Sequence, residues 1–322
     1  MKAVVVQKPG APEVLKIEDR PLPPTEGGWV RIHVKGFGLN RAEMFTRQGH
    51  SPGVSFPRIL GIECVGLVDH DPSQKYEKGA QVAAIMGGMG RKFDGSYAQY
   101  VVVPLECVIP FHSQLPWSVL AALPEMFHTT HGALSESLEL KQNDTLLIRG
   151  GTSSIGLLAA RLAKAMGAHV VSTSRSHERI EFLKANGADD VVLDTGQILG
   201  AVRKLFPEGV TKVLELVGAT TLVDSLSCTA TGGIVSMVGI LGGKWILDGF
   251  EPMRDIPHLV KLTIYTTDAV TPSANLFQAF LDDVAKGNFT LAPPKVFALE
   301  GIIEAHRLME ANEAKAKLVV VF

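Results

Sequence analysis

Cysteine is scarce in this chain. Its 322 residues include three cysteines, Cys64, Cys107 and Cys228, which lie far apart and form no Cys-x-x-Cys pair. A disulfide framework or a four-cysteine zinc site needs more cysteines at closer spacing. We therefore expect neither of them.

Long apolar runs and an excess of charge of one sign are also lacking. No run reaches the roughly 18 apolar residues of a membrane span, and the apolar run at residues 3–6 is too short for a signal-peptide core. Lys and Arg number 31 against 33 Asp and Glu, a formal net charge of −2, which argues against a nucleic-acid binder. We expect a cytoplasmic protein that binds neither nucleic acid nor membrane.

What is present is typical of globular proteins. Hydrophobic residues make up 46% of the chain and charged residues 20%, so a sizeable core can form and disorder is excluded as the main character. At roughly 150 residues per domain, the length predicts about two domains.

The chain has two regions that differ in composition and in predicted secondary structure. Up to about residue 115 it is rich in Gly and Pro, and short β-type runs occupy residues 3–6, 29–34, 65–68, 81–85 and 97–103. Many short strands between turns predict a compact β barrel or sandwich.

From about residue 120, apolar β runs alternate with helical stretches. The β runs occupy residues 145–149, 169–173, 190–193, 212–216, 234–238 and 262–266. Their spacing leaves room for one crossover helix each, which predicts an α/β fold with a mostly parallel, doubly wound sheet of about six strands. Helices at 274–286 and 299–311 and a final strand at 317–322 follow. A lone strand needs a partner, so it could complete the N-terminal β domain.

A glycine-rich turn joins the first strand of this series to its helix. Small residues at Gly150, Ser153 and Gly156 let backbone N–H groups approach a pyrophosphate at the positive end of the helix. Because Ser replaces the middle Gly of Gly-x-Gly-x-x-Gly, an ordinary tight turn is the alternative. The place of the turn at the start of a βαβ series favours dinucleotide binding. The candidate cofactor-binding residues here and in the later strand ends are Gly150, Thr152, Ser153, Ser154, Ile155, Gly156, Val217, Gly239 and Ile240.

The end of the second strand indicates which dinucleotide binds. NAD sites usually place an acidic residue there, whereas this chain has Ser174 followed by Arg175, with Arg179 close behind. A guanidinium can bind the 2′-phosphate of NADP. The two arginines could instead be solvated residues of a first helical turn, but cations are disfavoured there. We therefore predict NADP(H).

Six segments spread over the chain carry a family resemblance. They are GLNRAE (38–43), LGIECVG (60–66), DGSYAQYV (94–101), LPEMFHTT (123–130), EAHRLME (304–310) and KLVV (317–320). In this order they resemble the medium-chain dehydrogenase/reductase superfamily. They are most similar to its zinc-independent branch, the NADPH:quinone oxidoreductases and zeta-crystallin-like proteins.

The resemblance implies both a fold and an activity. It implies a GroES-like catalytic domain at residues 1–115, completed by 271–322, and a Rossmann NADP-binding domain at 116–270. The implied enzyme transfers hydride from NADPH to a quinone or an activated alkene, an enone or enal. Asn40 and Thr129 are the candidate catalytic residues and also cofactor contacts, and Lys317 completes the candidate cofactor site.

The sequence argues against a catalytic metal. Zinc members of this superfamily carry ligands at positions that here hold Asn40, Ile62 and Glu125, and Ile cannot ligate zinc. Glu125, His128 and His131 recur at helical spacing and could share a face. A half-buried helix start with solvated polar groups is the favoured interpretation, so we expect no metal.

Little other chemistry stands out. Hydride transfer needs few protein groups because the cofactor carries the reactive hydride. Tyrosines common in bacterial quinone reductases are replaced by Phe45 and Ser51, which removes possible proton donors for a quinone. An enone or enal that takes its proton from solvent stays compatible. The alternatives are a zinc-type alcohol dehydrogenase and a non-catalytic NADPH-binding protein.

The strand at 262–266 is expected at the edge of the parallel sheet. An unprotected apolar edge invites pairing with another chain, and a two-fold axis beside it would join two sheets into one. The family resemblance points to the same homodimer. The alternative is that the loop at 242–250 covers the edge and the protein is a monomer.

Overall fold

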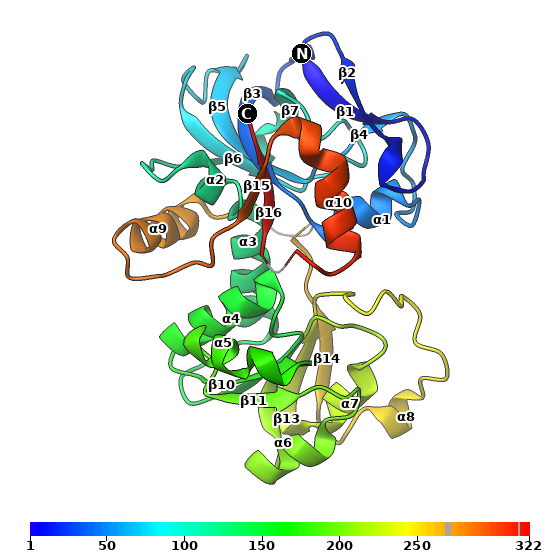
Figure 1. Ribbon diagram of the computed structural model, residues 1–322. Helices are drawn as coiled ribbons and strands as arrows, with labels where there is room; N and C mark the ends of the chain where they lie inside the picture. The colour runs from blue at the N-terminus through cyan, green and yellow to red at the C-terminus, as the bar shows by residue number, and fades with distance from the viewer. Residues whose placement is uncertain (268–271, 315) are drawn as a thin grey trace. The chain divides into compact units, whose positions relative to one another are not determined.

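The computed structural model describes residues 1–267, 272–314 and 316–322 (Figure 1). The chain divides into two compact units. The first unit is Met1–His128 with Thr267–Phe322, and the second unit is Thr129–Thr266. The first unit runs past the boundary at residue 115 expected from the sequence, because helix α2 (Trp117–Leu120) packs on strands β3 (Trp29–Gly38) and β16 (Leu318–Val321). The expected boundary at 270/271 lies outside the described residues.

The first unit is built mainly from strands. Its elements are β1 (Lys2–Val6), η1 (Pro12–Val14), β2 (Leu15–Asp19), β3, α1 (Arg41–Arg47), β4 (Arg58–Ile59), β5 (Glu63–His70), β6 (Gln81–Ile85), β7 (Tyr100–Pro104), η2 (Leu105–Cys107), β8 (Val108–Pro110), α2, the start of α3 (Pro124–Gly132, which continues into the second unit), α9 (Ala274–Ala285), β15 (Lys295–Phe297), η6 (Leu299–Gly301), α10 (Ile302–Glu310) and β16. One sheet has the order β2-β1-β4. The other has the order β15-β16-β3-β5-β6-β8, and β7 pairs with β3.

The last strand of the chain joins the N-terminal sheet. Strand β16 runs antiparallel to β3, with Val319 opposite Gly38 and Val321 opposite Gly36. The pairing predicted for the final strand is therefore confirmed. Its consequence is that Lys317, one residue before β16, is brought beside the segment that follows β3.

The second unit holds a six-stranded parallel sheet (Figure 1). Its elements are η3 (Ala133–Ser137), β9 (Thr145–Arg149), α4 (Ser154–Ala165), β10 (His169–Ser174), η4 (His177–Arg179), α5 (Ile180–Ala185), β11 (Asp190–Leu193), α6 (Leu199–Leu205), β12 (Val210–Glu215), α7 (Leu222–Ser227), β13 (Thr229–Met237), α8 (Pro252–Asp255) and β14 (Lys261–Ile264). The strand order is β11-β10-β9-β12-β13-β14. This is the order of a dinucleotide-binding Rossmann sheet. The spacing of the apolar runs predicts the parallel sheet of about six strands that is found.

The core of the second unit lies on the faces of this sheet. Helix α4 packs on β9 and β10, and its alanines Ala159, Ala160 and Ala163 are buried, which permits a close approach. One apolar cluster of the unit includes Leu147, Val213 and other residues of strands β9 to β13 with residues of α6 and α7. Among the described residues, no helix is long and apolar enough to cross a membrane.

Candidate functional site

The turn after β9 has a backbone that glycine alone adopts readily. Gly150 has a φ of +92°, and a Cβ on Gly151 would lie 2.9 Å from the Cβ of Ser172. A Cβ on Gly156 would lie 2.7 Å from the carbonyl oxygen of Gly150. A side chain is thus excluded at Gly151 and at Gly156 by the local packing, which lets a phosphate group approach the backbone there.

Helix α4 begins directly after this turn. Ser153 is its N-cap, and its Oγ accepts a hydrogen bond of 3.1 Å from the N–H of Gly156. The first N–H groups of any helix lack intrahelical acceptors, so those of Ser154 and Ile155 point out of the helix end. Together with the helix dipole they form an anion site, and Thr152 lies in the same turn. The turn and the helix end fit a dinucleotide pyrophosphate.

The loops after β12 and β13 lie beside one another. The carboxylate of Glu215 accepts hydrogen bonds from the N–H groups of Val217 (2.7 Å) and Gly218 (2.9 Å). A Cβ on Gly239 would lie 2.4 Å from the carbonyl oxygen of Leu216, so only glycine allows this approach. Val217, Gly239 and Ile240 therefore lie at the same carboxyl edge of the sheet as the glycine turn.

The end of β10 carries a serine and an arginine. The Oγ of Ser174 accepts a hydrogen bond of 3.1 Å from the N–H of Ser176. The next side chain, Arg175, is exposed. Arg179 lies 5.4 Å from the ring centroid of Phe182, so its guanidinium stacks on the following helix. Of the two arginines, Arg175 is the one that is solvent-exposed beside the end of β10.

A buried polar cluster lies in the first unit. The Nζ of Lys317 donates to the Oδ1 of Asn40 (2.5 Å) and to the Oε1 of Glu63 (2.8 Å), and the Nδ2 of Asn40 donates to the same Glu63 oxygen (2.9 Å). Lys317 can only donate and an ionised carboxylate can only accept, so the amide of Asn40 has one possible orientation. The three side chains hold one another in fixed positions.

Glu43 extends this cluster. Its Oε2 accepts from the backbone N–H of Asn40 (3.1 Å) and its Oε1 from that of Ile62 (3.1 Å), which ties helix α1 to the segment before β5. The side chain is 1% exposed, and burial, assisted by the nearby Glu63 carboxylate, raises the pKa of Glu43 to about 7. Glu43 is thus a carboxylic acid that titrates near neutral pH.

The charge on Lys317 is maintained by its surroundings. Burial opposes that charge, but the attraction of Glu63 and further carboxylates outweighs burial and raises the pKa of Lys317. A Cβ on Gly38 would lie 2.3 Å from the Oε1 of Glu63, so glycine is required there for the cluster to form. Glu43 and Glu63 are not among the candidate site residues predicted from the sequence, although both lie in segments that carry the family resemblance, GLNRAE (38–43) and LGIECVG (60–66).

The start of helix α3 contacts the same cluster. The N–H of Glu125 donates to the Oε2 of Glu63 (2.9 Å), and the Nδ1 of His128 lies 2.7 Å from the carbonyl oxygen of Pro124. Thr129, on the same helix, is buried. Among the residues that the structure describes, no group of three or more His, Cys, Asp or Glu could hold a metal ion.

Two family models match the chain. The Alcohol dehydrogenase GroES-like domain matches residues 26–113, and the Zinc-binding dehydrogenase matches residues 154–285. The matches together cover more than half of the chain, one over the first unit and the other mainly over the second.

Individual proteins are similar over nearly the full length. The quinone oxidoreductase of Homo sapiens is 27% identical over 332 residues, covering 100% of this chain and 98% of its own. Prostaglandin reductase-3 of Mus musculus is 27% identical over 330 residues, covering 94% and 83%. The structure of a mycobacterial protein in complex with NADPH matches with a TM-score of 0.88 at 26% sequence identity. The match covers 100% of this chain and 100% of the mycobacterial chain.

Proposed function

Because the chain belongs to the quinone oxidoreductase branch of the medium-chain dehydrogenase/reductase superfamily, we propose that it transfers hydride from NADPH to a quinone or an activated alkene without a metal. Membership of this family supports the coarser statement that the chain is an oxidoreductase that uses a nicotinamide cofactor. The observation that carries the finer proposal is the glycine turn before the N-terminus of helix α4, together with Arg175 after β10, where NAD enzymes carry an acid.

The choice of NADPH rests on charge. Ser174 is the last residue of β10, and the exposed Arg175 follows it. A carboxylate at that position would accept hydrogen bonds from ribose hydroxyls and repel a 2′-phosphate, whereas a guanidinium attracts the phosphate. A mycobacterial relative has been solved with NADPH bound, which supports the same choice.

The polar residues of the first unit are proposed to hold the cofactor in place and to take no part in the reaction themselves. NADPH, when bound, supplies the hydride. Both amide hydrogens of Asn40 are directed at carboxylates, to Glu63 at 2.9 Å and to Glu43 at 3.5 Å. Asn40 is therefore not placed to donate to a substrate carbonyl. We assign to its Oδ1, which keeps a second lone pair beside the Lys317 contact, the role of accepting a hydrogen bond from a cofactor hydroxyl. Thr129 remains the candidate contact of the nicotinamide.

Donor chemistry supports a reaction without zinc. The positions that carry zinc ligands in zinc-dependent relatives hold Asn40, Ile62 and Glu125 here. Ile62 has no ligating atom, and the amide of Asn40 is held by Glu63 and Lys317. Zn²⁺ prefers Cys and His. In the proposed reaction the hydride goes to the β carbon of an enone or enal and a solvent proton to its α carbon.

A steady-state panel tests the proposal. Purified protein, dialysed against a chelator, is mixed with NADPH or NADH and with quinones, enones, enals and, in the oxidative direction, simple alcohols with NADP⁺. We expect the protein to oxidise NADPH with at least one quinone or activated alkene and to oxidise NADH much more slowly. We expect this activity to need no added zinc. Activity confined to alcohols and restored only by zinc would favour an alcohol dehydrogenase. Tight NADPH binding without turnover of any acceptor would favour a non-catalytic binding protein.

A further inference from the structure

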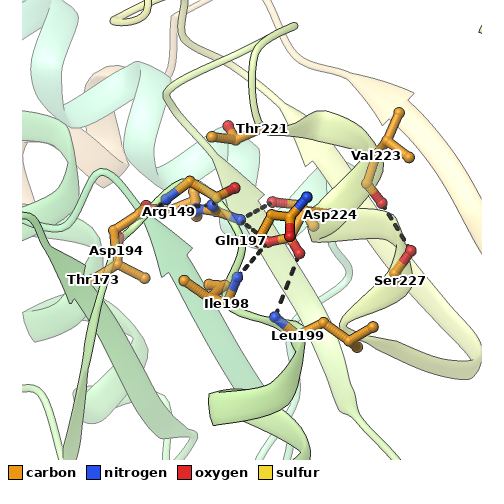
Figure 2. Close-up of polar contacts among 12 residues, drawn as sticks. Arg149, Thr173, Asp194, Gln197, Ile198, Leu199, Thr221, Val223, Asp224 and Ser227 are labelled. Carbon is orange, nitrogen blue, oxygen red and sulfur yellow. Dashed lines mark hydrogen bonds and ion pairs between the residues drawn. The ribbon is translucent and has the colours of Figure 1, made fainter.

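Arg149 is the last residue of β9, directly before the glycine turn. Its side chain is fully buried, at 0% exposure. The guanidinium donates from Nε and Nη2 to the two carboxylate oxygens of Asp194 (2.6 and 2.9 Å) and from Nη1 to Asp224 (2.7 Å). Figure 2 shows Arg149 among these acidic residues of the second unit. One cation thus joins the segment after β11 to helix α7.

Further hydrogen bonds connect this group to the glycine turn. The Oγ1 of Thr173 accepts from the N–H of Gly150 (3.0 Å) and is itself hydrogen-bonded to the carboxylate of Asp194. The other carboxylate, that of Asp224, accepts from the N–H of Ile198 (2.9 Å). The segments that follow β9 and β11 and the end of β10, at Thr173, are thus connected to Arg149, at the edge of the sheet where dinucleotides bind.

Arg149 is the cation that both Asp194 and Asp224 contact. Burial works against ionisation of Asp194, but hydrogen bonds from Arg149 and Gly196 outweigh it and lower the pKa of Asp194. The neighbouring Glu215 has its pKa raised by burial. Removal of Arg149 would leave the carboxylates of Asp194 and Asp224 without their cation, under a site for an anionic cofactor.

Asp194 lies next to the residues proposed to choose the cofactor. Its N–H donates to the carbonyl oxygen of Ser174 (2.8 Å), and Arg175 follows Ser174 directly. Asp224 lies on α7, which follows β12. Its carboxylate binds the same Arg149 guanidinium as Asp194, and it accepts from the N–H groups of Ile198 (2.9 Å) and Leu199 (3.4 Å). Asp224 is thus held to the segment before α6, whereas Asp194 is held to Ser174.

We propose that Arg149 is a specificity-determining positioning residue, which neutralises Asp194 so that the end of β10 accepts the 2′-phosphate of NADPH. This inference rests on the proposed use of NADPH. NADH has a neutral hydroxyl in place of that phosphate, so an uncompensated Asp194 carboxylate would repel NADPH far more than NADH.

A matched pair of double variants tests the proposal. Arg149→Met/Asp224→Asn keeps the Asp194 carboxylate, and Arg149→Met/Asp194→Asn keeps the Asp224 carboxylate. Both have the same net charge and one half-buried carboxylate without its cation. Calorimetric dissociation constants for NADPH and NADH are measured for each, with thermal unfolding as the check that each is folded.

The expected result is a change in the ratio of the two dissociation constants. The variant that keeps Asp194 should lose about tenfold in its preference for NADPH over NADH, as expected for charges several ångströms apart at a protein surface. The variant that keeps Asp224 should lose less of that preference, because its remaining carboxylate is held to the segment before α6, whereas Asp194 is held to Ser174. If both variants lose affinity for NADPH and NADH by the same factor, Arg149 is merely structural and the proposal is overturned.

Single variants keep the test decisive if the double variants do not fold. Asp194→Asn leaves Arg149 paired with Asp224, and it should keep or increase the preference for NADPH; a decreased preference would contradict the proposal. Arg149→Lys keeps the charge and should keep the preference while lowering the melting temperature. A wild-type protein that binds neither cofactor would overturn the proposed function itself, and this inference with it, whereas equal effects on both cofactors would overturn the inference alone.

Discussion

At the scale of single residues, charge decides which groups the two candidate regions can accept. Arg175 is exposed at the end of β10, while Lys317 and Glu63 are buried as an ion pair with a 2.8 Å separation. An exposed guanidinium is available to a ligand phosphate, whereas the buried pair fixes the orientation of Asn40. Arg175 is therefore expected to affect cofactor choice, and the Lys317–Glu63 pair is expected to affect the geometry of the polar cluster.

Arg175→Ala should remove the preference for NADPH. A hydrogen bond to a charged group contributes about 1.5–3 kcal/mol, so NADPH binding should weaken strongly and NADH binding little. Lys204→Ala on α6 is the matched control, because it removes one positive charge from an exposed position away from β10. Calorimetry measures both cofactors. Equal weakening of NADPH and NADH by Arg175→Ala would contradict the assignment.

Glu43 should make the stability of the fold depend on pH. Its pKa is raised from 4.5 to about 7, so between these values the unfolded chain releases a proton that the folded chain keeps. The contribution of Glu43 is fully present below pH 4.5 and is lost as pH rises through 7, a decrease of about 3 kcal/mol in the free energy of unfolding.

Glu43→Gln tests this contribution, because glutamine resembles the protonated acid and does not titrate. The difference in unfolding free energy between the variant and the wild type, measured by denaturant titration at several pH values, should shift in favour of the variant between about pH 4.5 and 7. Glu181→Gln, at a side chain that is 86% exposed, should show no such shift. A difference that stays constant with pH would refute the buried-acid interpretation.

At the scale of elements, the long apolar runs could be predicted from the sequence and the short edge strands could not. The runs at 145–149 and 190–193 coincide with β9 and β11, since buried parallel strands have a strong apolar signal. Strand β13 begins at Thr229, earlier than the run at 234–238, because Thr229 pairs with Val210 across an irregularity. Strands β4 and β15 are two and three residues long and form only because a partner strand is present.

The candidate site also has parts that could be predicted from the sequence and parts that could not. The glycine turn could be predicted because its residues are contiguous. The contacts of Asn40 with Glu63 and Lys317 join residues 23 and 277 positions apart, and no local pattern indicates such contacts. Lys317 was predicted to be near the cofactor, whereas the ion pair that holds it required the pairing of β16 with β3.

Gly151→Ala should disturb the turn after β9. Its Cβ would lie 2.9 Å from the Cβ of Ser172 and 3.0 Å from the carbonyl oxygen of Thr173, so the backbone must shift. We expect a loss of about 1–3 kcal/mol in unfolding free energy and weaker binding of NADPH and NADH alike.

Gly200→Ala on α6 is the control for this substitution. Nothing lies within 4 Å of a Cβ at Gly200, and alanine is favoured over glycine in a helix by about 1 kcal/mol. This variant should be as stable as the wild type or more stable, with unchanged cofactor binding. Unchanged binding in Gly151→Ala would place the pyrophosphate elsewhere.

At the scale of the whole molecule, the edge strand β14 bears on assembly. It is the last strand of the parallel sheet and pairs on one side with β13. Ile264 on this strand is 68% exposed, and an exposed apolar edge is unfavourable in a monomer. We propose that two copies of the chain pair through β14 to form a homodimer.

Ile264→Lys should weaken that dimer, because it places a charge in the middle of an apolar contact. Leu205→Lys, at an exposed position on α6, carries the same change away from β14 and should leave the assembly unchanged. Sedimentation at micromolar concentration measures both. A wild type that sediments as a monomer at that concentration rules out the proposed dimer.

The most direct test of the proposed activity follows the hydride itself. NADPH carrying deuterium at the transferable position of its nicotinamide is mixed, in the presence of a chelator, with an enone that the protein reduces. The account predicts a saturated product with one deuterium at its β carbon, formed in equal amount to the NADP⁺ released, and a proton from solvent at the α carbon. A product without deuterium, or no reduction of any quinone or activated alkene by the NADPH-bound protein, would contradict it.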